Sequence, residues 1–150
     1  MIDQNTRILL QAIQKLRPGA DFAFSEDSIE WFDTEQTQPS RAEIDAEIAY
    51  LESPEYEVEK WRKSASLSRR RFKIGEALYT HNGSPLVELI EALLAGLPEP
   101  DKTIAGIAYR ESAQFDRLDP FIVQFSQALG MSEEETDEFF RYCHNEEWNQ

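Results

Sequence analysis

Residues 84–98 read SPLVELIEALLAGLP, and this stretch indicates the fold class most clearly. Its large apolar residues fall on more than one side of a helix, which is typical of a helix buried inside a bundle. Ser84-Pro85 favours a helix start, because proline is tolerated in the first turn, and Gly96 and Pro98 favour a stop. We therefore expect the most buried helix of the chain here. Its apolar residues are Leu86, Val87, Leu89, Ile90, Leu93 and Leu94.

The segments on either side also predict helices. Ser68 is placed to cap a helix that ends at Asn82-Gly83, a pair that readily adopts left-handed geometry. Residues 102–118 predict a single further helix. Its apolar residues share one side: Ile104, Ile107, Ala108, Phe115 and Leu118. Asp119-Pro120 begins a short helix that Gly130 ends.

A last helix follows Ser132, which has Glu135 three residues later, as in a capping box. Three acidic residues lie in its first turn, where the helix dipole favours negative charge. Together with the preceding segments, it predicts a helical bundle over residues 67–150.

The first third of the chain predicts a different structure. Apolar residues recur at helical spacing over residues 8–16, and Pro18-Gly19 ends the helix. The segments ADFAF and SIEWF alternate aromatic and polar residues around a short polar turn, which predicts a β-hairpin. The polar residues 33–39 predict an exposed connection, and Ser40 with Glu43 predicts a capped helix start.

The predicted fold class is therefore mostly α, of the α+β type. A small α+β unit covers residues 1–36, a polar helical connector covers 37–66, and the helical bundle covers 67–150.

Charge restricts the classes of partner. The 150 residues carry a net charge of −14, which opposes binding to nucleic acid or to anionic lipid, because both would repel the chain. The N-terminus lacks the pattern of a signal peptide, and no run of 18 apolar residues predicts a membrane span. We expect no membrane partner and no nucleic-acid partner.

The candidate catalytic residues are few. His81 and His144 lie far apart and match no metal-ligand spacing, and no glycine pattern predicts a phosphate-binding loop. Cys143 precedes His144, but neighbours on a helix do not face each other, and Cys143 shares a side with Phe139 and Phe140. We expect a core cysteine, with an intermolecular disulfide as the alternative. We predict no enzyme, no metal and no cofactor.

Two features are candidates for binding a partner. The aromatic hairpin carries Phe22, Phe24, Trp31 and Phe32, and it either packs into a core or accepts a strand or an apolar patch from a partner. The basic residues Arg69, Arg70, Arg71 and Lys73 follow Lys60, Arg62 and Lys63 along the chain. They either pair with acidic residues of the same chain, dock an acidic partner, or contact nucleic acid.

Several stretches resemble a known family. They are ILLQAIQKLRPGADFAF, SIEWFD and QPSRAEIDAEIA in the first part, and LSRRRFKIGEALY, LVELIEALLAGLPEP and IAGIAYRESAQFDRLDPFIVQFSQALGMSEEETDEFF in the second. They resemble small tail-fibre-associated and tail-fibre assembly proteins of tailed bacteriophages and prophages.

The resemblance implies a non-enzymatic role, without cofactors, in the host cell cytoplasm during assembly. The expected function is that of a chaperone that binds the tail fibre or a baseplate neighbour. One alternative is a permanent tail or baseplate subunit of the virion at the fibre attachment site. Another is a regulatory module that binds nucleic acid through the basic residues.

Overall fold

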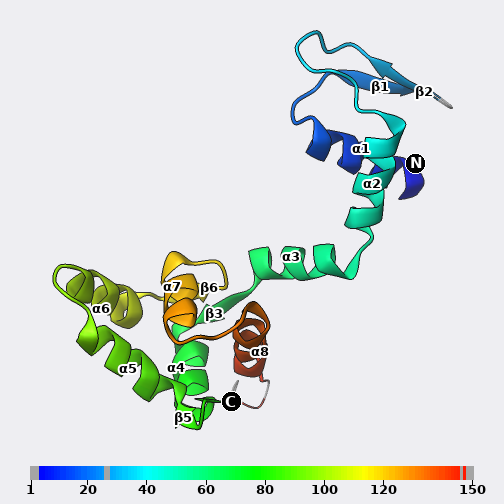
Figure 1. Cartoon of the computed structure of the whole chain (residues 1–150). Coiled ribbons are helices and arrows are strands. Elements are labelled where there is room, and N and C mark those ends of the chain that lie inside the picture. Colours follow the sequence, from blue (N-terminus) through cyan, green and yellow to red (C-terminus); the bar gives the residue numbers. More distant parts are fainter. Residues whose placement is uncertain (1–3, 26–27, 146, 148–150) are drawn as a thin grey trace. The chain divides into compact units, whose positions relative to one another are not determined.

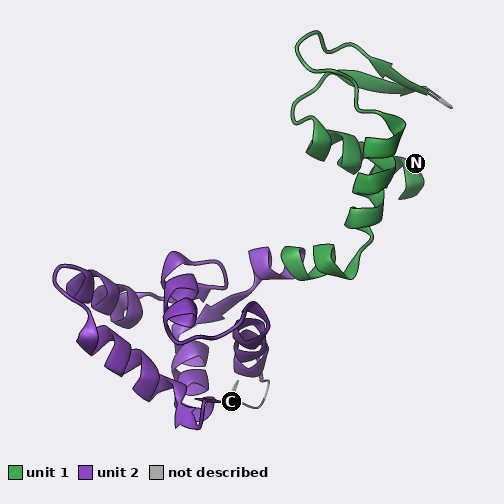
Figure 2. Cartoon of the chain, in the orientation of Figure 1, with its two compact units in different colours: residues 1–59 green, residues 60–150 purple. Residues whose placement is uncertain are grey.

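The computed structural model describes residues 4–25, 28–145 and 147, and within them the chain is mostly helical. These residues form eight helices and six short strands, which confirms the predicted α+β class (Figure 1). They divide into two compact units, residues 1–59 and residues 60–150 (Figure 2).

Unit 1 contains a pair of helices and a β-hairpin. Helix α1 (Gln4–Leu16) packs against α2 (Arg41–Leu51), and strands β1 (Phe22–Ser25) and β2 (Ser28–Trp31) form the hairpin. Ala12 and Ile13 of α1 are buried with Ile44 and Leu51 of α2. The predicted capping box is present at the start of α2, where Ser40 N donates to Glu43 Oε2 at 2.7 Å and Glu43 N donates to Ser40 Oγ at 3.2 Å.

The predicted connector over residues 37–66 is not a separate part. Helix α2 buries Ile44 and Leu51 against α1, so the first half of the connector belongs to unit 1. The boundary at residues 59–60 lies inside helix α3 (Pro54–Ser64), which has no buried residue. Its Tyr56 packs edge-on against Tyr50 of unit 1, and its Trp61 packs against the core of unit 2.

Unit 2 is a helical bundle with short strand pairs. Its helices are α4 (Arg69–Leu78), α5 (Leu86–Gly96), α6 (Asp101–Glu111), α7 (Pro120–Ala128) and α8 (Glu133–Cys143). Strand β3 (Ser66–Ser68) pairs antiparallel with β6 (Gln114–Asp116), and β4 (Thr80–His81) pairs with β5 (Ser84–Pro85). Asn82 and Gly83 have positive φ angles, as predicted, and they form the turn between β4 and β5.

Aromatic rings fill much of the core of unit 2. Phe72 of α4 stacks on Phe115 of β6 with ring centroids 4.1 Å apart, and it meets Phe125 and Phe139 edge-on. Helix α8 buries five residues and α5 buries three, so α5 is not the most buried helix. The physical reason is that the apolar residues of α5 lie on more than one side of the helix, and packing leaves Val87, Leu89 and Leu93 only partly covered.

The prediction of a single helix over residues 102–118 is wrong. Helix α6 ends at Glu111, and the chain becomes extended at β6 because pairing with β3 brings Phe115 onto Phe72. The apolar residues of this stretch consequently separate. Phe115 is buried, whereas Ile104, Ile107 and Leu118 are 62%, 57% and 46% exposed.

Candidate partner-binding surfaces

The hairpin of unit 1 gathers its apolar residues on one face. The strand register pairs Phe22 with Trp31 and Phe24 with Ile29, and the pairs in between place Ala23, Ser25, Ser28 and Glu30 on the opposite, exposed face. Phe22 stacks on Trp31 with centroids 5.8 Å apart and meets Phe24 edge-on at 5.5 Å. All four apolar side chains are only partly buried. The aromatic face, defined as Phe22, Phe24, Ile29 and Trp31, is therefore a surface and not a closed core.

Helix α1 covers this face incompletely. A surface hollow of about 430 Å³ lies between the end of the hairpin and α1, and Leu9, Phe24, Ile29 and Arg41 contribute to its lining. The hollow leaves room there for a further apolar group. Ile29 was missed as a candidate, although its alternation with Trp31 along the strand indicates the same face.

The edges of the hairpin are also available. Among the described residues, no third strand pairs with β1 or β2. Phe32, the fourth predicted aromatic residue, lies just beyond β2, where it is 54% exposed. Three of the four predicted aromatic residues thus share one face, and Phe32 is an exposed ring outside the strand.

The polar residues 33–39 hold one end of the hairpin in place. Trp31 Nε1 donates to Gln36 O at 2.8 Å, and Arg17 Nε donates to Thr37 O at 2.9 Å. The Asp33 carboxylate accepts hydrogen bonds from Gln36 N at 2.7 Å and Glu35 N at 2.8 Å, and these bonds lower the pKa of Asp33. The stretch is largely exposed, as predicted, and its hydrogen bonds also order it as a loop that orients Trp31.

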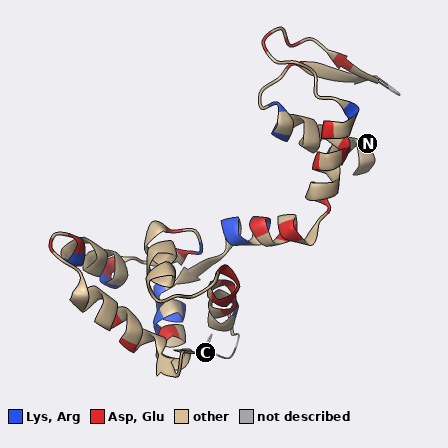
Figure 3. Ribbon diagram, viewed as in Figure 1, with Lys and Arg blue, Asp and Glu red and all other residues tan. Residues whose placement is uncertain are grey.

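The four predicted basic residues separate into two pairs at the start of α4. Arg69 and Arg70 are exposed. Arg71 donates to Cys143 O at 3.3 Å, and Lys73 Nζ lies 3.0 Å from Glu76 Oε1 and 3.2 Å from the centre of the Tyr109 ring. Figure 3 shows the basic residues of α4 in blue and the acidic first turn of α8 in red. Arg71 and Lys73 are therefore engaged within unit 2. Docking of an acidic partner or of nucleic acid by the basic residues of this run stays a prediction.

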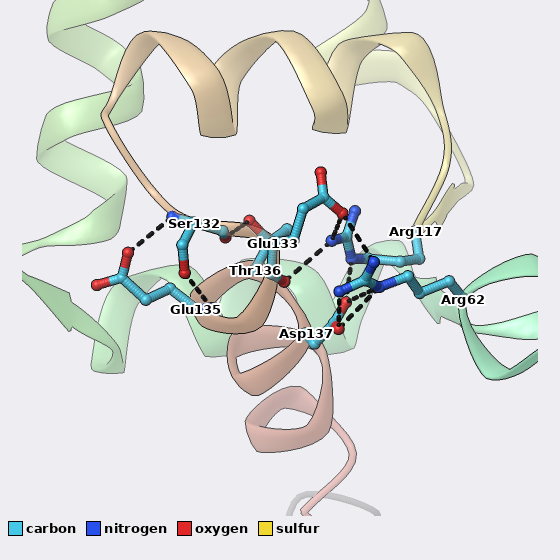
Figure 4. A network of polar contacts seen from close by, with 7 residues as sticks. All are labelled: Arg62, Arg117, Ser132, Glu133, Glu135, Thr136 and Asp137. Atoms are coloured by element: carbon cyan, nitrogen blue, oxygen red, sulfur yellow. Dashed lines mark hydrogen bonds and ion pairs between the residues drawn. The ribbon is translucent and has the colours of Figure 1, made fainter. Parts of the chain in front are cut away.

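A buried ion network joins three segments of unit 2 (Figure 4). Arg117 is 1% exposed, and its Nε donates to Asp137 Oδ1 at 2.7 Å while its Nη2 donates to Glu133 Oε2 at 2.8 Å. Arg62 Nε donates to Asp137 Oδ2 at 2.9 Å. Both oxygens of Asp137 are thus paired with a guanidinium group. Pairing of Arg62 with acidic residues of the same chain was one of the predicted alternatives. The sequence does not indicate its partner, because Arg62 and Asp137 are 75 residues apart.

A second buried cluster surrounds a carboxylate of α4. Tyr109 Oη donates to both oxygens of Glu76 at 2.9 Å, and both residues are buried. Burial raises the pKa of Glu76, against the smaller opposing effects of Lys73 and Tyr109. The sequence did not single out Glu76, because its surroundings include Tyr109, whose side chain reaches it from α6. Glu76 and Tyr109 are thus shielded from solvent, while the side chain of Lys73 at the edge of the cluster is 33% exposed.

Cys143, His81 and His144 all have positions that serve the packing or the ends of the helices. Cys143 is fully buried against Gly75, where an added Cβ would lie 2.1 Å from its Sγ, and burial raises the pKa of its thiol to about 12. His81 is buried with its Nε2 3.0 Å from Leu129 O, and His144 forms the C-cap of α8. Across the described part of the chain, no three His, Cys, Asp or Glu side chains are grouped as metal ligands would be.

Comparison of the chain with protein-family models, with curated proteins and with solved structures finds no match. None of the helices in the described residues is long and apolar enough to cross a membrane.

Proposed function

We propose that this protein is a non-enzymatic tail-fibre assembly protein, a chaperone that binds the tail fibre or a baseplate neighbour through the aromatic face of its hairpin. The resemblance of the quoted stretches to tail-fibre-associated proteins supports the identity of the partner. The assignment of the binding surface rests on one observation: the apolar side chains of the two-stranded hairpin are only partly buried.

A two-stranded hairpin is marginal in water by itself and gains stability from a third strand or from cover over its apolar face. A partner strand on either edge would satisfy the unpaired backbone groups of that edge, and its side chains would cover the rings. Completing the burial of one such ring contributes on the order of 1 kcal/mol. Phe22, Phe24, Ile29 and Trp31 together therefore offer enough apolar surface for the centre of a stable interface.

Co-expression with the neighbouring tail-fibre protein, followed by size-exclusion chromatography, tests the proposal. We expect the two proteins to elute together at micromolar concentration. Phe24→Thr should reduce co-elution, because it removes a ring from the aromatic face while keeping a residue that suits a strand.

Glu30→Thr is the matched control, because Glu30 lies on the opposite face of the same hairpin. Persistent separate elution of the unmodified proteins would contradict the proposal. Equal loss of co-elution in the two variants would contradict the assignment of the aromatic face.

The alternative role, a permanent virion subunit, uses the same surface and differs only in the fate of the protein after binding. Mass spectrometry of purified virions separates the two roles, because an assembly chaperone acts in the host cell cytoplasm and is released. We expect the protein to be absent from the virions.

A further inference from the structure

Unit 2 has an apolar groove between α6 and α7. Two adjoining hollows, of about 440 Å³ and 140 Å³, share Leu97, Ala105, Phe121 and Gln124 in their linings, so they form one continuous groove. Ile104 lies at its edge and is 62% exposed. We call this feature the α6–α7 groove.

The floor of the groove is preorganised. The ring of Phe121 contacts three other rings, with centroids 5.9 Å from Tyr109, 6.2 Å from Phe115 and 5.6 Å from Phe125. Tyr109, Phe115 and Phe125 are buried in the core of unit 2. A ring held on this many sides keeps its position before a ligand arrives, which lowers the entropic cost of binding.

The charged side chains that line the groove are acidic. Among the described residues, the linings of the two hollows include the carboxylates of Asp101 and Asp119 and no Lys or Arg. Asp119 Oδ1 accepts a hydrogen bond from Phe121 N at 2.8 Å, so this carboxylate is held at the start of α7. The neighbouring cation Lys102 lines a different hollow and donates to Ala95 O at 3.2 Å. An apolar ligand with a positive charge at one end matches this arrangement.

We propose that the α6–α7 groove binds an amphipathic helix of a partner protein, with an apolar face in the groove and a Lys or Arg beside Asp101 and Asp119. The groove is distinct from the hairpin of unit 1, so this inference does not depend on the proposed function. It assigns unit 2 a binding surface of its own.

The walls of the groove favour a helix over an extended strand. Helices α6 and α7 satisfy their backbone groups internally and offer side chains only. A strand in the groove would leave its own backbone groups unpaired on that side, whereas a helix pairs its backbone groups within itself.

Charge also argues against a second copy of this chain as the occupant. Each copy carries a net charge of −14, so two copies repel each other, and the carboxylates at the groove would face a further acidic surface. A cationic helix gains from the same field.

A nuclear magnetic resonance titration of the full ¹⁵N-labelled chain tests the proposal. The probe is a synthetic helical peptide of roughly four turns with leucines along one face and two lysines at one end. We expect shifts of the amide signals of α6 and α7, and binding that weakens as salt is added. A matched peptide with two glutamates in place of the lysines should bind about fivefold more weakly.

Two exposed isoleucines of α6 provide a matched pair of variants. Ile104→Gln should weaken binding of the lysine peptide about tenfold, because it removes an apolar group at the groove. Ile107→Gln should leave the affinity nearly unchanged, because Ile107 is similarly exposed, at 57%, but lines neither hollow. Both residues are exposed, so neither variant should unfold the chain.

Three outcomes would overturn the proposal. The first is no binding of the lysine peptide up to about 1 mM. The second is equal binding of the lysine and glutamate peptides, or equal effects of the two isoleucine substitutions. The third is concentration-dependent dimerisation of the chain that Ile104→Gln abolishes, which would make a second copy the occupant.

Discussion

Unit 1 and unit 2 use their aromatic residues in opposite ways. In unit 1 the rings of Phe22, Phe24 and Trp31 remain on a partly exposed hairpin face. In unit 2 the rings of Phe72, Phe115, Phe125, Phe139 and Phe140 are buried together in one core. The buried apolar residues described in unit 1 are Ala12, Ile13, Ile44 and Leu51, all from the pair α1 and α2.

The difference follows from the smaller size of unit 1. A unit of about 60 residues buries a smaller fraction of its surface than a larger one, so its stability depends on few contacts. Unit 1 uses its helix pair for stability and leaves the hairpin with apolar surface to gain from a partner. The unit with the weaker core therefore carries the more available binding surface, as expected for regions that open or bind.

The largest effect should come from disrupting the ion network of unit 2. Its loss would lower the stability of unit 2 and so reduce the difference in stability between the two units. Asp137→Ala should lower the free energy of unfolding of unit 2 by about 3–5 kcal/mol, because it leaves the buried charge of Arg117 without its main partner. Hydrogen exchange of the α8 amides measures this change, and exchange of the α1 amides should stay the same. Glu133→Ala is the control, since that side chain is 54% exposed and its loss should cost about 1 kcal/mol or less.

The second prediction concerns the contact between α4 and α8. Gly75→Ala should cost about 1–3 kcal/mol, because the new Cβ would collide with Cys143 Sγ. Urea denaturation monitored by circular dichroism measures the loss. The double variant Gly75→Ala with Cys143→Ala should recover part of it, since the smaller side chain makes room. Additive losses would show that the collision is not the cause.

The third prediction uses the buried carboxylate of unit 2. Because burial raises the pKa of Glu76 above its ordinary value, the folded chain binds this proton more tightly than the unfolded chain. The contribution of Glu76 to stability is therefore greatest below its ordinary pKa and is lost as the pH rises through the raised pKa. In that window stability falls with a limiting slope of about 1.4 kcal/mol per pH unit.

Glu76→Gln should remove this contribution, and urea denaturation at a series of pH values measures the difference from the unmodified chain. Tyr109→Phe should enlarge the loss, because the Tyr109 hydroxyl donates to the charged form of Glu76. Parallel pH profiles for the unmodified chain and Glu76→Gln would contradict the assignment.

The smallest expected effect lies in unit 1. Phe24→Thr should change the free energy of unfolding by about 1 kcal/mol or less, because the ring is only partly buried in the free chain. Thermal denaturation measures this change, and Ile13→Ala provides the contrast, with a cost of about 2–5 kcal/mol at a fully buried position. A large loss for Phe24→Thr would mean that the hairpin belongs to the core.

Local features could be predicted from the sequence. Ser40 with Glu43 and Ser132 with Glu135 form the two predicted capping boxes, and the hairpin forms where aromatic and polar residues alternate. The helix starts at Asp119-Pro120 and at Ser132 also agree with the structure. These features depend on hydrogen bonds and side chains within a few residues, which sequence patterns record directly.

For the candidate sites, the sequence placed Phe22, Phe24, Trp31 and Phe32 together on one hairpin, and the strand register of the structure puts the first three on one face. The run Arg69, Arg70, Arg71 and Lys73 carried no information about which cations would be engaged, because Cys143 and Tyr109 reach them from distant helices.

The mostly helical class, the positions of the main helix starts and the aromatic hairpin were all determined by the sequence alone. Tertiary packing was needed to assign α2 to unit 1, to end α6 at Glu111 and to leave Ile104 exposed beside the α6–α7 groove. Pairings such as β3 with β6 and Arg117 with Asp137 join segments far apart in the chain. The free energy of such contacts depends on which segments pack together, and no local pattern contains that information.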